Sequence, residues 1–197
     1  MTGTPSALDR QLRDLIDKDA IRDVVLRYCR GIDRRDADLI RSAYHHDVTE
    51  HHGAYRGDSV DDFVDYAGGR SDLFDRVCHY VTNHLIELDG DVAYSEAYAI
   101  ALHRSRIDGV ESNTIFGGRY VDTMERRDGR WAIADRVVVC DWSRVDIVDP
   151  WTREELFASG MNDRTDPVYH RGEPRIGALL RSMERDADSV PRSSGSQ

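Results

Sequence analysis

Apolar residues at the start of the chain recur at three- and four-residue steps, the spacing of one face of an α-helix. They are Leu8, Leu12, Leu15, Ile21, Val24, Val25, Tyr28 and Ile32. Ser6 precedes this run and has an acid three residues later, so we predict a helix capped by Ser6. Gly31 suits the helix end. The stripe predicts that one face of this long helix lies on a core.

Two shorter helices and a strand are predicted next. Asp36 is expected to cap a helix that runs to Tyr44. Residues 48–55 have the pattern of a short strand. Ser59, with Asp62 three residues later, is expected to cap a third helix that ends near Gly68-Gly69.

After residue 76 the apolar period changes to two, which is typical of strands. Strands are expected at residues 77–88, 92–106, 114–126 and 131–143. Asp-Gly pairs lie between them at Asp89-Gly90-Asp91, Asp108-Gly109 and Asp128-Gly129, and such pairs favour tight antiparallel hairpins. Helices followed by a meander predict an α+β fold. In it a curved antiparallel sheet wraps around the N-terminal helices and leaves a cone-shaped pocket.

The chain length of 197 residues fits one core. We expect residues 1–150 to form that domain. Residues 151–184, with short helices expected at 149–157 and 176–184, are predicted to pack on the domain or on a neighbouring subunit. The polar residues 185–197 are expected to be a disordered tail.

Composition excludes several classes of protein. A hydrophobic content of 40% and a charged content of 32% are typical of a globular chain. The net charge of −10 repels phosphate backbones and anionic lipids, so we expect neither nucleic acid nor a membrane as partner. The three cysteines (Cys29, Cys78 and Cys140) and the absence of a signal-like N-terminus favour the cytoplasm. Lys18 is the only lysine, which argues against Schiff-base chemistry.

The chemistry is expected in a strand that carries His79 and in the end of the first helix, where Asp33 lies. A neutral histidine accepts a proton near neutral pH, because its reference pKa is near 6.5. A carboxylate on the other ring nitrogen fixes the tautomer and stabilises the imidazolium that forms. We therefore predict that Asp33 and His79 meet in space as a base and its orienting carboxylate.

Three segments resemble the SnoaL-like branch of the nuclear-transport-factor-2-like (NTF2-like) superfamily. They are residues 28–36, the segment His79-Tyr80-Val81-Thr82-Asn83, and residues 120–136 with the turn Arg127-Asp128-Gly129-Arg130-Trp131. The resemblance spans roughly residues 8–145 and implies a cone-shaped α+β barrel. The superfamily includes scytalone dehydratase, ketosteroid isomerase, limonene epoxide hydrolase, bile-acid 7-alpha-dehydratase and hexachlorocyclohexane dehydrochlorinase.

The resemblance implies roles for four residues. In dehydratase-like members an Asp at the end of the first helix pairs with a strand His, and these positions are Asp33 and His79 here. A residue five before the Asp faces the pocket, and here it is Tyr28. An arginine five residues after the tryptophan of the last hairpin matches Arg136. Tyr28 is expected to protonate a leaving hydroxyl or hold a carbonyl, and Arg136 to bind a carbonyl oxygen or developing negative charge.

These residues predict a cofactor-free lyase, a dehydratase acting on a small hydrophobic cyclic molecule of polyketide, aromatic or steroid type. A double-bond isomerase or polyketide cyclase would use the same base. A third alternative is a binding or assembly module, like the beta subunits of ring-hydroxylating dioxygenases. Taken one at a time, each of the four residues also has an ordinary structural explanation. The fold implies a homo-oligomer, a dimer or trimer.

Further residues are candidates for contacting the substrate: Asn83, His103, Tyr44, Tyr55 and Phe116. Strict alternation places Asn83 on the same face as His79 and His84 on the opposite face, unless a bulge intervenes. The pairs His45-His46 and His51-His52 span a helix end and a short strand, where three ligands do not converge, so we expect no metal site.

Overall fold

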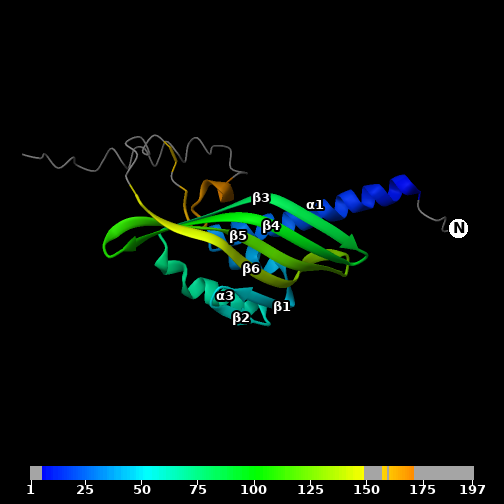
Figure 1. Cartoon of the computed structure of the whole chain (residues 1–197), viewed down its shortest axis with the longest axis horizontal. Coiled ribbons are helices and arrows are strands. Elements are labelled where there is room, and N and C mark those ends of the chain that lie inside the picture. Colours follow the sequence, from blue (N-terminus) through cyan, green and yellow to red (C-terminus); the bar gives the residue numbers. More distant parts are fainter. Residues whose placement is uncertain (1–5, 149–156, 159, 171–197) are drawn as a thin grey trace, which may run out of the picture. The chain divides into compact units, whose positions relative to one another are not determined.

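The computed structural model describes residues 6–148, 157–158 and 160–170 (Figure 1). The chain divides into two compact units, residues 1–149 and 150–197. In the second, a 3-10 helix spans Pro167–His170, and the Asp166 carboxylate accepts backbone N–H groups of Met161 and Val168. The helices expected at 149–157 and 176–184 and the tail at 185–197 lie almost wholly outside the described residues. The packing of the extension stays a prediction.

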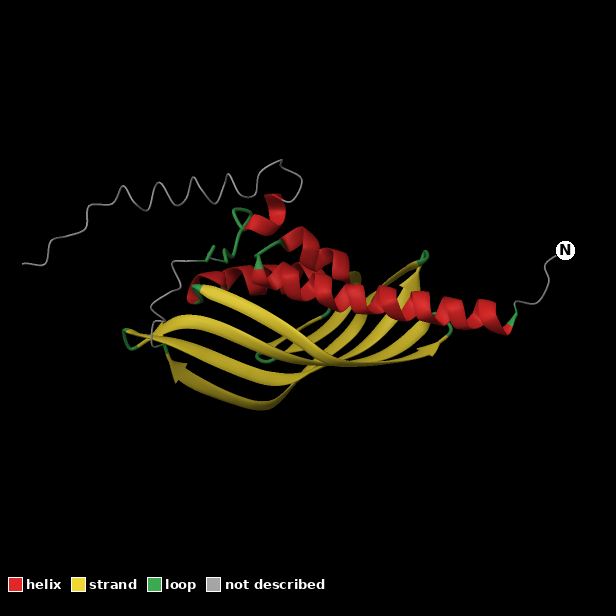
Figure 2. Ribbon diagram, turned by 90° about the horizontal axis from the view of Figure 1, so that it is seen from above, coloured by secondary structure: helices red, strands yellow, loops and turns green. Residues whose placement is uncertain are grey.

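The first helix, α1, spans Ala7–Asp33, and its Ser6 capping box is confirmed. On its apolar face Ile21, Val24, Val25 and Tyr28 are buried, and Ile32 is half-buried. Leu8, Leu12 and Leu15 are instead 72%, 54% and 64% exposed. For this part of the stripe the predicted contact with the core is wrong, because the N-terminal end of α1 projects past the ends of the strands (Figure 2).

Two short helices follow, α2 (Ala37–Ala43) and α3 (Val60–Gly69), and a 3-10 turn, η1 (Ser71–Leu73), comes after α3. The caps Asp36 and Ser59 are both confirmed. Gly31 does not end α1, which continues to Asp33. Its role is close packing, since a Cβ there would lie 2.7 Å from Cγ1 of Ile40. The missing side chain lets α2 approach α1 and helps to place Asp33.

One sheet contains all six strands, in the order β2-β1-β6-β5-β4-β3. The bounds are β1 Tyr44–His52, β2 Tyr55–Gly57, β3 Arg76–Asp89, β4 Val92–Ile107, β5 Val110–Arg127 and β6 Arg130–Ile147. The meander from β3 to β6 is confirmed as antiparallel. The pairing of β1 with β6 is parallel. The hydrophobic pattern of the sequence does not predict it, because the two strands lie far apart in the chain. The fold is α+β, and its sheet is curved but not closed.

Turns and glycines shape this sheet. Asp108-Gly109 and Asp128-Gly129 all have positive φ angles, as a two-residue hairpin turn of type I′ requires. In β5 the register against β6 shifts between Gly117 and Gly118. A Cβ on Gly117 would collide with the ring of Trp142. The two glycines therefore permit a bend that larger residues would block.

The helices cover the concave face of the sheet (Figure 2). Small side chains on β4 face them and are buried: Ala93, Ser95, Ala97, Ala99 and Ala101. The opposite face carries exposed apolar side chains: Tyr80, Leu85, Tyr94, Tyr98, Ile100, Val121 and Trp142. No helix within the described residues is long and apolar enough to cross a membrane.

Candidate active site

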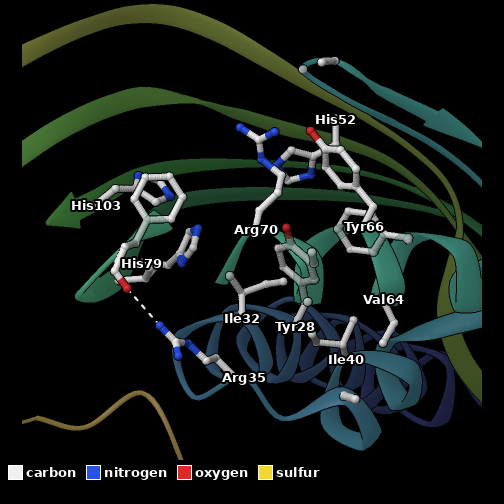
Figure 3. A pocket seen from close by; sticks show the side chains of 18 residues that line it. Tyr28, Ile32, Arg35, Ile40, His52, Val64, Tyr66, Arg70, His79 and His103 are labelled. Atoms are coloured by element: carbon white, nitrogen blue, oxygen red, sulfur yellow. Dashed lines mark hydrogen bonds between the residues drawn. The ribbon is translucent and has the colours of Figure 1, made fainter. Parts of the chain in front are cut away.

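A cavity of about 560 Å³ lies where the C-terminal end of α1 meets α2, α3, β1, β3 and β4 (Figure 3). Most of its wall is apolar, with Ile32, Ile40, Phe63 and Val64 among the lining residues. Its polar lining consists of Tyr28, Tyr66, the histidines His52, His79 and His103, and the arginines Arg35 and Arg70. None of the described residues that line it is acidic, although the chain as a whole carries a net charge of −10. The volume is that of a site for a drug-sized molecule.

Asp33 and His79 are brought together at one wall. The Nδ1 atom of His79 lies 2.6 Å from Oδ1 of Asp33, and the backbone N–H of His79 donates to Oδ2 at 3.1 Å. Both carboxylate oxygens are therefore occupied, and Nδ1 carries a proton toward Asp33. The His79 side chain is only 5% exposed. This arrangement leaves Nε2 as the ring atom available to a substrate.

His103 stands beside this pair. Its ring lies 6.0 Å from that of His79, edge to face, and 4.8 Å from that of Phe74. Burial, reinforced by His79, lowers the pKa of His103 from 6.5 to about 4. His103 is thus neutral at neutral pH and is available for hydrogen bonding.

This burial has a consequence for stability. The unfolded chain binds a proton at His103 below pH 6.5, whereas the folded chain resists protonation down to about pH 4. The resulting stability is present above pH 6.5 and is lost as the pH falls through this window. Between about pH 7 and pH 4 the free energy of unfolding should fall in both the wild type and the His103→Asn variant. In His103→Asn it should fall less than in the wild type, by on the order of 2 kcal/mol after allowance for partial exposure. Urea unfolding of both proteins at the two pH values measures the difference, and parallel losses would contradict it.

Tyr28 forms the floor of the cavity between His79 and His52 (Figure 3). Its side chain is buried, and its hydroxyl has no hydrogen-bond partner among the described residues. Burial raises the pKa of Tyr28 well above 10, although the Arg136 guanidinium acts in the opposite direction. The hydroxyl therefore keeps its proton and is a hydrogen-bond donor that lacks an acceptor.

Arg136 does not line this cavity. It is fully buried and forms a two-pronged bond with Asp122, at 2.7 and 2.8 Å. Its guanidinium carbon lies 4.2 Å from the ring centre of Tyr28 and 4.4 Å from that of Tyr120. Burial favours loss of the Arg136 proton, but Asp122, with Tyr44 and Glu50, more than offsets this effect and raises the pKa of Arg136 above its usual range. The cation therefore supports the face of Tyr28 from behind and does not reach a ligand in the cavity.

Of the five residues predicted to contact the substrate, His103 alone lines this cavity. Tyr44 is buried and accepts a hydrogen bond from Arg136. Tyr55 packs on Phe63 and Tyr66, behind the wall. Phe116 lies opposite Ala101 and is outside the lining.

The alternation argument for β3 is wrong because of a bulge. The register shifts between Val81 and His84, so that His79, Val81 and His84 face Ala101, Ala99 and Ala97 in turn. Asn83 is consequently exposed. His84 lies on the inner face, where its Nε2 atom is 2.8 Å from the Ser95 hydroxyl.

Sequence reasoning missed three residues of this region: His52, Glu50 and Asp122. His52 and Glu50 share parity with the buried Val48 on β1, and this parity was the signal that could have placed them on the core face. Asp122 shares parity with Tyr120 on β5. A side-chain cluster of the kind that holds a metal ion is absent from the described part of the chain.

Known structures with the same fold include several enzymes. Kfla4162 from Kribbella flavida aligns with a TM-score of 0.62 at 19% identity, covering 66% of this chain and 95% of that one. A scytalone dehydratase-like protein from Novosphingobium aromaticivorans aligns with a TM-score of 0.59 at 20% identity, covering 71% of this chain and 96% of that one. Hexachlorocyclohexane dehydrochlorinase LinA-type3 from Novosphingobium barchaimii aligns with a TM-score of 0.60 at 21% identity, covering 71% of this chain and 99% of that one. At these identities the similarity establishes the fold alone.

Sequence comparison is more specific about the family. A search of curated protein sequences finds no match. The model of the SnoaL-like domain matches residues 13–137, which is more than half of the chain and contains most of α1, the candidate site and most of the sheet. The chain belongs to the SnoaL-like domain family, within the NTF2-like fold.

Proposed function

We propose that the protein is a cofactor-independent lyase, a dehydratase that eliminates water from a hydrophobic cyclic substrate. The observation that carries this proposal is the Asp33–His79 pair at the wall of a largely apolar cavity of about 560 Å³. A buried imidazole held in one tautomer by a carboxylate is suited to proton abstraction. The dehydratase-type and dehydrochlorinase structures that share the fold support the same reaction class.

In this proposal Nε2 of His79 takes a proton from a carbon beside an activating carbonyl. Asp33 stabilises the imidazolium that forms, and such base catalysis contributes about 10²–10⁴-fold. Tyr28 donates a hydrogen bond to the carbonyl oxygen as negative charge develops on it. His103 contributes a neutral polar edge to the wall beside the base.

The first experiment separates the reactions that share this base. The protein is incubated with β-hydroxy ketones of two to four fused rings, and the products are analysed by mass. Loss of one water supports the dehydratase. An unchanged mass with a moved double bond favours the isomerase, and ring closure favours the cyclase.

A binding or assembly module remains the alternative without chemistry. The same panel, with ligand binding followed by thermal shift, addresses it. Binding without turnover, together with co-purification of a large iron-containing subunit, would favour the module. The Tyr28 hydroxyl, without a partner among the described residues, favours a bound ligand under either function, because a buried donor without an acceptor costs stability unless a ligand supplies one. The Asp33–His79 pair is what favours an enzyme.

Tyr28→Phe tests the tyrosine. Removal of the hydroxyl is expected to lower kcat/KM by about 10²–10³-fold, the effect of losing a hydrogen bond to developing charge. The free energy of unfolding should not fall, because the hydroxyl is buried without a partner in the free protein. Steady-state kinetics and urea unfolding measure the two effects. Unchanged kinetics would remove Tyr28 from the mechanism.

The expectation of a dimer or trimer also stays a proposal. The exposed apolar side chains on the outer face of the sheet provide a surface for it: Tyr80, Leu85, Tyr94, Tyr98, Ile100, Val121 and Trp142. Patches of this kind commonly mark contacts between proteins.

A further inference from the structure

A second pair of histidine and carboxylate stands at the cavity, on β1. Nδ1 of His52 lies 3.0 Å from Oε1 of Glu50. The Glu50 side chain is fully buried, whereas that of His52 is 32% exposed and lines the cavity. The His52 ring is stacked on Phe63, with 5.5 Å between ring centres and 29° between ring planes. The ring is therefore held by a carboxylate at one edge and an aromatic face beneath it.

Local structure explains this pair. Glu50 and His52 are two residues apart on one strand, so both side chains lie on the same face. In the parallel pairing of β1 with β6, Glu50 lies opposite Arg136. That pairing places the glutamate inside the fold, where a glutamate is rarely found without a partner. His51, between them, belongs to the other face of the strand.

The charges around Glu50 indicate what the pair requires. Arg136 already forms a bidentate ion pair with Asp122, donating hydrogen bonds to both carboxylate oxygens. Within the described residues, Oε2 of Glu50 has no hydrogen-bond partner. Glu50 also interacts through space with Arg136, but His52 is the side chain that bonds its Oε1 atom. A hydrogen-bond donor is what a buried carboxylate requires. The carboxylate thus orients the His52 ring through Nδ1 and leaves Nε2 as the ring atom available to the cavity.

The two pairs differ in a way that assigns their roles. The side chain of His79 is 5% exposed and that of His52 is 32% exposed. Solvent therefore has the better access to His52 for reprotonation. Ring centres run from His79 to Tyr28, Phe63 and His52 with spacings of 6.5, 6.4 and 5.5 Å. The base and the second histidine are therefore connected by the rings of Tyr28 and Phe63, and both act on the pKa of His103. Tyr28 can donate a hydrogen bond but is a weak acid that does not readily give up its proton, because burial raises its pKa well above 10.

We propose that His52, positioned by Glu50, is the general acid of this site and protonates the leaving hydroxyl. The inference rests on the proposed dehydratase function. His79 takes the proton from carbon, and the electrons of that C–H bond form the new double bond. The C–O bond breaks, and its oxygen keeps the electron pair and takes the proton of His52 Nε2, so water leaves. Exchange of one proton between each histidine and solvent then restores both.

The test compares two leaving groups. A two-ring β-hydroxy ketone needs an acid for departure of the hydroxyl, whereas its acetate ester releases a carboxylate that needs none. His52→Gln is expected to slow elimination from the hydroxy ketone by about 10²-fold or more and to leave the ester nearly unchanged. His51→Gln, on the other face of the same strand, is the matched control and should change neither rate. Equal losses for both substrates, or no loss for either, would overturn the assignment.

Glu50→Gln tests the positioning role by pH. Loss of the carboxylate destabilises the imidazolium, so the alkaline limb of kcat/KM should move to lower pH while the acidic limb stays in place. An NMR titration of the His52 ring in the wild type and in Glu50→Gln reports the same linkage without turnover. A wild type that eliminates neither substrate would refute the proposed function, whereas identical titrations of His52 in the two proteins would refute the pair.

Discussion

His79→Ala is expected to lower kcat/KM for the proposed elimination by about 10²–10⁴-fold, because it removes the group proposed to take the proton. The same loss is expected of Asp33→Asn, which keeps the shape of the side chain but no longer stabilises the imidazolium. Asp33 bonds both the ring and the backbone N–H of His79, so the alanine variant leaves one of its two contacts in place. Steady-state kinetics on any substrate found in the mass assay measures both losses.

Two variants separate chemistry from folding in this prediction. His79→Gln keeps a polar group near Asp33 but cannot act as the base, so it should be as inactive as His79→Ala and better folded. His84→Gln is the matched control, since His84 lies on the same face of β3 but bonds Ser95 and does not line the cavity. Full activity in His79→Ala, or equal loss in His84→Gln, would remove His79 as the base.

Arg136→Met is expected to reduce the free energy of unfolding by about 3–5 kcal/mol, since it leaves the buried Asp122 carboxylate without its partner. Both side chains are 0% exposed, so water cannot compensate for the lost ion pair. The change also removes the cation from the faces of Tyr28 and Tyr120. Urea or thermal unfolding measures the loss.

The double variant Arg136→Met with Asp122→Leu is the informative comparison. It replaces the ion pair with apolar groups of similar size, which in other proteins is often neutral or stabilising. We expect it to recover most of the stability that the single variant loses. Failure of the double variant to recover would contradict the account of Arg136 as a charge held for Asp122. If Arg136 instead bound substrate directly, the single variant would lose activity and keep its stability.

Much of the fold was predictable because the signals are local. The Ser6, Asp36 and Ser59 caps and the Asp-Gly turns depend on residues next to one another in the chain. The long strands follow from a period-two pattern that needs no knowledge of their neighbours. The resemblance to the SnoaL-like family rested on residues inside the region that the family model matches.

Errors arose where a side chain's surroundings depend on distant segments. The stripe on α1 has the same period over its whole length, yet Leu8, Leu12 and Leu15 at its N-terminal end are exposed. A bulge in β3 moved Asn83 out of the cavity face and His84 onto the inner face. Arg136 was expected at the ligand, but its bond with Asp122 holds it behind Tyr28.

By itself, the sequence determined the α+β layout, the family, and a histidine and an aspartate of the right chemistry for proton transfer. Only the tertiary structure decided that Asp33 and His79 touch, that the buried Tyr28 hydroxyl has no acceptor among the described residues, and that Glu50 holds His52 at the same cavity. The physical reason is that capping, turn formation and periodicity act over a few residues. Burial, pairing of charges and strand register are set by segments that meet only when the curved sheet closes over the helices.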